Sequence, residues 1–178
     1  MGILQKFRQK LNPNRYPSDY WPSVVVLMAE PTFPSSDEIL SRAQKAWGNA
    51  GPATIVGTLR NGASLVIRCG PMSFSVHCTN ARYGEPSERD DDVLQRPWND
   101  HKAWMSVDLP QLRNQELDQS GDLANMYKVL LVFVFLSWNS NCLGVYFPGE
   151  GVTVPNFGDL AASINWGRRS GLNLNFLS

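Results

Sequence analysis

The pattern of apolar positions begins with a strand followed by a helix. Residues 24–28 are Val-Val-Val-Leu-Met, apolar on both faces, which indicates a central strand of a covered sheet. Ser35 then stands three residues before Glu38, the spacing of a helix-starting capping box. Apolar side chains recur at helical spacing as far as Trp47, and Gly48 is a natural stop. The sequence therefore predicts a buried strand and a capped helix.

Three further strands are predicted next. Residues 54–59 and 64–69 flank Arg-Asn-Gly-Ala, whose Asn-Gly pair is typical of a tight hairpin turn. A Gly-Pro turn leads into residues 73–79, where apolar and polar side chains alternate and His77 falls on the polar face. The simplest arrangement is an antiparallel meander with one face toward water.

The segment 83–99 interrupts this pattern. It is rich in charge and longer than most connections, so a functional or mobile loop is expected there. Three consecutive aspartates within it, residues 90–92, lack the spacing of a calcium loop, and no metal site or cofactor is predicted. A strand over 101–108 follows, with His101 on its apolar face and Trp104 on the other.

The second half again combines a helix with strands. Residues 123–138 are apolar nearly all round, which predicts a buried helix, although their Val/Phe alternation would also fit a strand. Residues 142–147 and 151–154 form a predicted hairpin around Pro-Gly-Glu-Gly. We therefore expect this half to add two strands to the sheet.

A short C-terminal helix completes the pattern. Its expected inward side chains are Leu160, Ala161 and Ile164, and Gly167 is expected to end it. From Arg168 onward the tail is polar and is predicted to be loosely held. The fold class is then α+β: a largely antiparallel sheet of about six to seven strands, covered by two main helices and the short C-terminal helix.

The N-terminal segment differs from the rest. Residues 1–22 form an amphipathic arm and a Pro-rich linker, and residues 23–178 are predicted to form a single α+β domain. The arm is basic on its polar side, so weak contact with a membrane surface is possible. Its short length favours docking onto its own domain or onto a partner chain.

Composition narrows the function classes. Of the 178 residues, 43% are hydrophobic and 18% are charged, a composition typical of a globular protein. Sixteen basic side chains balance sixteen acidic ones, so the chain has no net positive charge to attract a phosphate backbone. No nucleic-acid binding is therefore expected. The longest apolar run, residues 129–136, is too short for a transmembrane segment. Three cysteines without CxxC spacing and the missing signal sequence predict a reducing, cytoplasmic location.

Few side chains suggest catalysis. His101, His77 and Asp100 are weak catalytic candidates, because histidine is the commonest general base and metal ligand. They would form a site only if their two strands were neighbours. Ordinary structural roles are the favoured interpretation.

Aromatic side chains suggest an interface. Trp98 and Trp104 have no evident place in the predicted core, and aromatic residues of this kind anchor protein interfaces. Tyr20 and Trp21 of the linker are further candidates. The alternative, weighed evenly, is that the N-terminal segment covers these tryptophans.

Two short segments resemble an uncharacterised bacterial domain-of-unknown-function family. Residues 98–104 match its Trp-x-x-His-x-Ala-Trp strand, and residues 142–147 match its Leu-Gly-Val-Tyr strand, with Cys142 where the family has alanine. The resemblance spans residues 24–156 and carries no assigned reaction. Members occurring beside secretion or toxin systems imply an accessory or immunity role.

Together these features predict a bacterial cytoplasmic protein that is not an enzyme. It would act as a protein-binding or accessory module, through a protein partner or through self-association. The alternative is a small hydrolase or metal-dependent enzyme that uses His101, His77 and Asp100.

Overall fold

The fold centres on one seven-stranded antiparallel sheet. The structure is a computed structural model that describes residues 23–48, 51–59, 64–84, 92–109 and 120–175, with only the backbone described at residues 92 and 120–127. Its strands are β1 (Ser23–Met28), β2 (Ala53–Leu59), β3 (Ser64–Cys69), β4 (Met72–Thr79), β5 (Ala103–Asp108), β6 (Cys142–Phe147) and β7 (Val152–Pro155). Their order is β2-β3-β4-β5-β1-β6-β7, and all neighbours are antiparallel.

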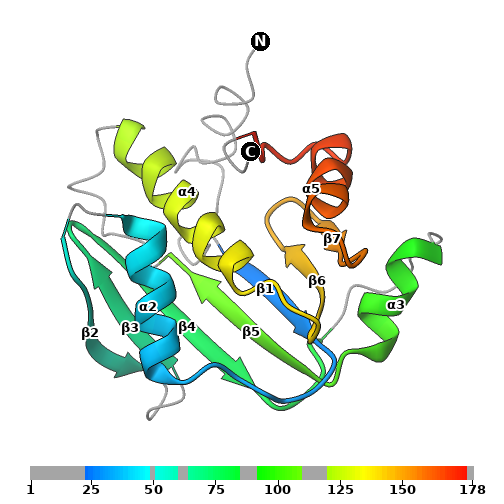
Figure 1. Cartoon of the computed structure of the whole chain (residues 1–178), viewed down its shortest axis with the longest axis horizontal. Helices are drawn as coiled ribbons and strands as arrows, with labels where there is room; N and C mark the ends of the chain where they lie inside the picture. Colours follow the sequence, from blue (N-terminus) through cyan, green and yellow to red (C-terminus); the bar gives the residue numbers. More distant parts are fainter. Residues whose placement is uncertain (1–22, 49–50, 60–63, 85–91, 110–119, 176–178) are drawn as a thin grey trace.

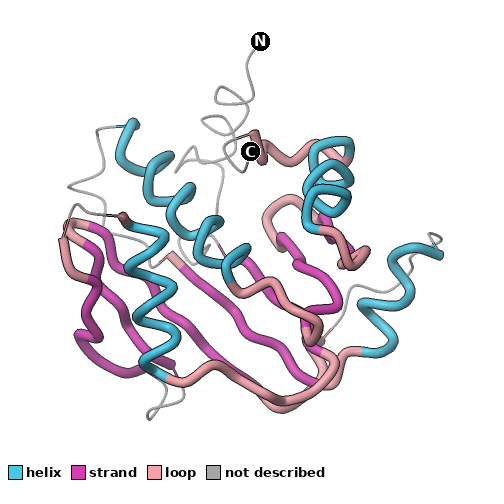
Figure 2. Tube along the Cα trace, viewed as in Figure 1, coloured by secondary structure: helices cyan, strands magenta, loops and turns pink. Residues whose placement is uncertain are grey.

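Four helices accompany the sheet in the described residues (Figure 1). They are α2 (Ser36–Trp47), α3 (Asp92–Asp100), α4 (Ser120–Leu136) and α5 (Leu160–Arg169). The predicted α+β class is confirmed. The strands, drawn in one colour in Figure 2, form the layer on which these helices pack.

Strand β1 is central, as its apolar pattern predicts. It pairs with β5 on one side and β6 on the other. Val24, Val26 and Met28 belong to the main core, whereas Val25 and Leu27 are buried on the opposite face. A strand that is covered on both faces requires this unbroken apolar run.

The main core lies between the sheet and α2, α4 and α5. Ile39 of α2, Ile164 of α5 and the apolar face of α4 meet the inner side chains of the strands. The rings of Phe74 in β4 and Phe133 in α4 lie 5.2 Å apart and are tilted, an arrangement that adds to simple area burial. The apolar segment predicted as a buried helix is therefore α4. In the described part of the chain, no helix is both long and apolar enough to cross a bilayer.

Helix α2 has the ends that its sequence predicts. The Ser35 N–H donates to Glu38 Oε2 at 2.7 Å, and the Glu38 N–H donates back to Ser35 Oγ at 3.3 Å. At the other end, Gly48 has a φ of 77°, and its N–H donates to the Gln44 carbonyl. Backbone N–H groups that the helix ends would otherwise leave unsatisfied are thus bonded by residues of α2 and its caps.

The opposite face of the sheet, called here the second face, carries α3. The predicted loop over 83–99 is wrong for its last part, because Asp92–Asp100 is helical; residues 85–91 lie outside the described residues. Leu94, Pro97 and Trp98 recur at helical spacing, and α3 packs on β1, β6 and β7. Packing on the sheet overrides the charge and the internal proline that disfavour a helix here.

The chain around α5 also differs from the prediction. Gly167 does not end the helix but lies buried inside it, where an added Cβ would stand 2.7 Å from Leu174 Cδ1. Leu160 and Ala161 are exposed, whereas Ile164 is buried as expected. The tail is not loosely held as far as residue 175: Leu172 and Leu174 are buried, because the chain turns back onto the helix.

Candidate functional site

His101 is held between two backbone groups. It lies between α3 and β5, not in the predicted strand, and its side chain is 2% exposed. Its Nδ1 lies 3.0 Å from the Pro97 carbonyl oxygen, and the Tyr83 N–H donates to its Nε2 at 2.9 Å. This pairing assigns the proton to Nδ1. Burial, with a smaller contribution from the Arg82 charge, lowers the pKa of His101 and keeps the ring neutral.

His77 and Asp100 do not join His101 in one cluster. The two ring nitrogens of His77 lie 2.9 Å from Ser64 Oγ and 2.8 Å from Thr79 Oγ1. Asp100 ends α3 and is exposed. Among the described residues, no three His, Cys, Asp or Glu side chains are arranged to hold a metal ion. The two histidine rings thus meet different neighbours: backbone groups for His101, and the hydroxyls of Ser64 and Thr79 for His77.

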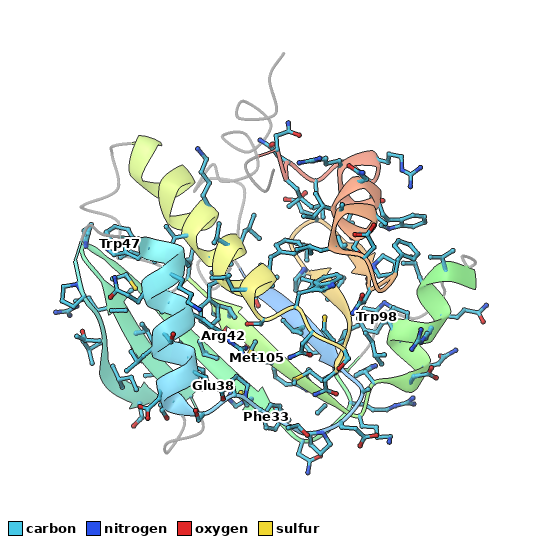
Figure 3. The ribbon with its side chains drawn as sticks, viewed as in Figure 1. Phe33, Glu38, Arg42, Trp47, Trp98 and Met105 are labelled. Carbon is cyan, nitrogen blue, oxygen red and sulfur yellow. The ribbon has the colours of Figure 1, made fainter. Side chains whose placement is uncertain are left out.

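The predicted interface tryptophans belong to a second-face aromatic cluster formed by Tyr83, Trp98, Trp104 and Tyr146. Tyr83 meets Trp104 edge to face at 5.2 Å, and Trp98 meets Tyr146 in the same way at 5.1 Å. The Trp98 indole N–H, on the α3 side of the sheet in Figure 3, donates to Thr153 Oγ1 at 3.1 Å. Trp98 and Trp104 are therefore half-buried against their own chain. Tyr20 and Trp21 lie outside the described residues.

The three thiols sit in apolar surroundings. Burial raises the pKa of Cys69 and of Cys78 to about 11, and that of Cys142 to about 12. All three are free cysteines. At neutral pH they are protonated and therefore poor nucleophiles or metal ligands.

A small hollow lies under the N-terminal half of α2, around Phe33, Glu38, Arg42 and Met105 (Figure 3). Its volume is about 150 Å³, close to that of a cavity that admits a benzene-sized group. Arg42 and Glu38 supply opposite charges at its wall, but the Glu38 carboxylate already accepts hydrogen bonds from Ser35. The hollow thus has room for a small ligand, and the Arg42 guanidinium in its wall is a group that such a ligand could contact.

The outer edge of β2, called here the β2 edge, is the most unusual surface of the sheet. Six of its seven residues are exposed, including Ile55 at 37%, Val56 at 44% and Leu59 at 45%. The strand, Ala-Thr-Ile-Val-Gly-Thr-Leu, carries no charge and no proline. Among the described residues, its only hydrogen bond outside the sheet is from the Ala53 N–H to Gln44 Oε1, at 2.7 Å. A row of backbone groups is therefore left for another strand.

The opposite edge of the sheet is closed. Strand β7 has four residues and ends at Pro155, which has no N–H to donate. Helix α5 packs against it, and the Trp166 indole N–H donates to the Thr153 carbonyl at 3.2 Å. Short length, proline, cover and a β-bulge are the usual protections of an edge strand, and in the described residues β2 shows only the bulge, at Val56.

The β2 edge is the feature that sequence reasoning missed. The uncharged segment 53–59 was recognisable as a strand, but only the strand order places it at the margin. A lack of charge over seven residues was the available signal. In comparisons with known proteins, no protein-family model, curated protein or solved structure matches this chain.

Proposed function

We propose that this chain is a protein-binding module that accepts an extended strand of another polypeptide at the β2 edge. The observation that carries the proposal is the contrast between the two margins of the sheet. One is short, covered and ends in proline, whereas the other is long, exposed and uncharged.

Strand addition supplies both affinity and selectivity at such an edge. Main-chain hydrogen bonds to the added strand give affinity, and side chains on alternating positions select the sequence. Seven residues of β2 extend over about 24 Å, enough for several backbone bonds. Soluble proteins usually protect their sheet edges because open edges promote aggregation. A single bulge at Val56 leaves most of β2 open, and we attribute this open edge to use in binding.

The composition of β2 defines the segment that it would bind. Thr54, Ile55 and Val56 are β-branched and uncharged, and Gly57 and Thr58 continue the strand without charge. A β-branched, uncharged segment packs best against such a row, and a charged one would lose hydration without gaining a partner. We therefore expect the bound segment to be apolar or hydroxyl-bearing and extended.

Two other expectations from the sequence concern a role implied by the family resemblance and an alternative enzymatic function. The family resemblance adds an accessory or immunity role in a bacterial cytoplasm. The alternative enzyme using His101, His77 and Asp100 gains no support from the geometry, because both rings already have neighbours at their nitrogens.

The proposal is tested by affinity capture with matched baits: wild type, Val56→Lys and Val56→Thr. Lysine places a charge on the β2 edge, whereas threonine keeps the β-branched shape and adds none. We expect the polypeptide captured by wild type and Val56→Thr to be lost with Val56→Lys. The bound polypeptide should also slow backbone hydrogen exchange in β2. Capture that ignores the lysine, or protection that falls elsewhere, would refute the proposal.

A further inference from the structure

We infer that the strand that occupies the β2 edge is β2 of a second copy of this chain, paired antiparallel about a two-fold axis near Val56. This inference rests on the proposed function and names its partner. It is carried by three features: the closure of the other margin, the charges beside the strand, and the position of Val56 in it.

Closure of the β7 margin limits how copies can join. A head-to-tail contact would require β2 of one copy to pair with β7 of the next, but α5 and the Trp166–Thr153 hydrogen bond cover that strand. Pairing of β2 with β2 uses the same surface on both copies and consumes both free edges. Such an isologous contact closes at two copies, whereas a head-to-tail one would grow into a fibre. The fold therefore favours a finite dimer with one continuous sheet.

The charges beside the edge are compatible with self-pairing. Strand β2 is uncharged, so antiparallel pairing brings no like charges together. Helix α2 packs on β2 and β3, carries Asp37 and Glu38 in its first turn and has Lys45 in its last turn. In the view of Figure 1, α2 crosses in front of β3 and β4, next to the end of the sheet that carries β2. A two-fold axis reverses the second helix, so its Lys45 end is directed toward the Asp37 end of the first, whereas Glu38 bonds Ser35 and lines the hollow beside Met105.

Val56 is the middle residue of the strand. Ala53–Leu59 extends three residues to each side of it, and the pairing with β3 shifts between Ile55 and Gly57, which leaves Val56 as the extra residue of a bulge. Its side chain is 44% exposed. A symmetric pairing of two β2 strands therefore brings the two Val56 residues close to each other. A seven-residue strand pair is a small interface, so we expect a weak dimer.

Charge complementation at Val56 tests the inference. Sedimentation velocity is measured over a micromolar concentration series for wild type, Val56→Thr, Val56→Lys, Val56→Glu and an equimolar mixture of the two charged variants. Wild type and Val56→Thr should dimerise. Each charged variant alone should associate at least about tenfold more weakly, because like charges then meet across the axis. The mixture should recover dimers.

Three results would overturn the inference: a monomeric wild type, charged variants that dimerise as well as wild type, or a mixture that stays monomeric. A monomeric wild type whose β2 still binds a captured polypeptide would leave the proposed function standing. If the wild type neither dimerises nor binds a captured polypeptide at β2, both the inference and the proposed function fail. Circular dichroism melting checks that each variant is folded. The double variants Thr54→Lys/Thr58→Lys and Thr54→Glu/Thr58→Glu supply a second charged pair, because antiparallel pairing about Val56 places Thr54 of one copy opposite Thr58 of the other.

Discussion

At the scale of single residues, His101 shows how burial and backbone contacts fix a titratable group. Its Nδ1 meets the Pro97 carbonyl, and its Nε2 accepts from the Tyr83 N–H. A second ring proton would remove the acceptor for Tyr83 and place a charge in a site that is 2% exposed. The neutral ring therefore ties the residues after β4 to the end of α3.

This arrangement predicts a pH-dependent stability. Burial lowers the pKa of His101 below its ordinary value of 6.5, so the unfolded chain binds the proton more readily than the folded one. The contribution of His101 to the free energy of unfolding is complete above pH 6.5 and is lost as the pH falls toward the folded pKa.

Urea unfolding across mildly acidic pH, with wild type and His101→Gln, measures this contribution. The wild type should lose stability more steeply than the variant as the pH falls. An NMR titration of the His101 ring gives its folded pKa directly. Equal slopes, or a folded pKa at or above 6.5, would contradict the account.

The thiols give a second prediction at this scale. With pKa values raised to about 11 for Cys69 and Cys78 and about 12 for Cys142, almost no thiolate exists at pH 8. A disulfide reagent should therefore react with the native chain about 100-fold more slowly than with the urea-unfolded chain. A thiol that reacts in the native state at the unfolded rate would show that its site is not buried as described.

At the scale of elements, the contact between α3 and β6 depends on Gly144. A Cβ added there would lie 3.0 Å from the Val154 carbonyl oxygen and 3.2 Å from Pro97 Cβ. We expect Gly144→Ala to displace α3 and to cost about 1–3 kcal/mol of unfolding free energy. Gly57→Ala is the matched control, because its Cβ would meet nothing within 4 Å. Equal stability of both variants in denaturant titrations would argue against this packing.

Trp104 distinguishes packing from binding. Its ring contacts Tyr83 at 5.2 Å and His77 at 5.3 Å on the second face. We expect Trp104→Ala to lower the free energy of unfolding by about 2–4 kcal/mol. Self-association measured below the melting transition should not change. A variant that keeps its stability and loses association would instead place the interface at this cluster.

The elements themselves were predictable where local chemistry determines them. Ser35, Glu38 and Gly48 define both ends of α2, and the unbroken apolar run marks β1 as central. Helix α3 was missed because its helical state depends on packing Pro97 and Trp98 against β6 and β7. The helical spacing of Leu94, Pro97 and Trp98 is a local signal for a helix, but it does not show the contact with the sheet that stabilises a helix containing Pro97.

The candidate site illustrates the same limit. Sequence reasoning could identify aromatic and histidine side chains, but their roles follow from neighbours distant in sequence: Thr153 for Trp98, and Tyr83 for His101. Likewise, the uncharged strand Ala53–Leu59 becomes a candidate interface only once the sheet order places it at the margin.

At the scale of the whole molecule, the sheet is asymmetric. One margin ends in the short, covered β7, and the other in the exposed β2. The main core is built from α2, α4 and α5 on one face, and α3 with the aromatic cluster covers part of the second face. Both faces are thus used within the chain, and the β2 edge is left for another polypeptide.

Hydrogen–deuterium exchange of the β2 amides, at low and high chain concentration, tests most directly the central claim that the β2 edge pairs with β2 of a second copy. We predict that exchange in residues 53–59 slows as concentration rises in wild type and in Val56→Thr, and does not slow in Val56→Lys. Exchange in β7 should not depend on concentration. Protection of other strands, with β2 exchanging equally fast at both concentrations, would contradict the account.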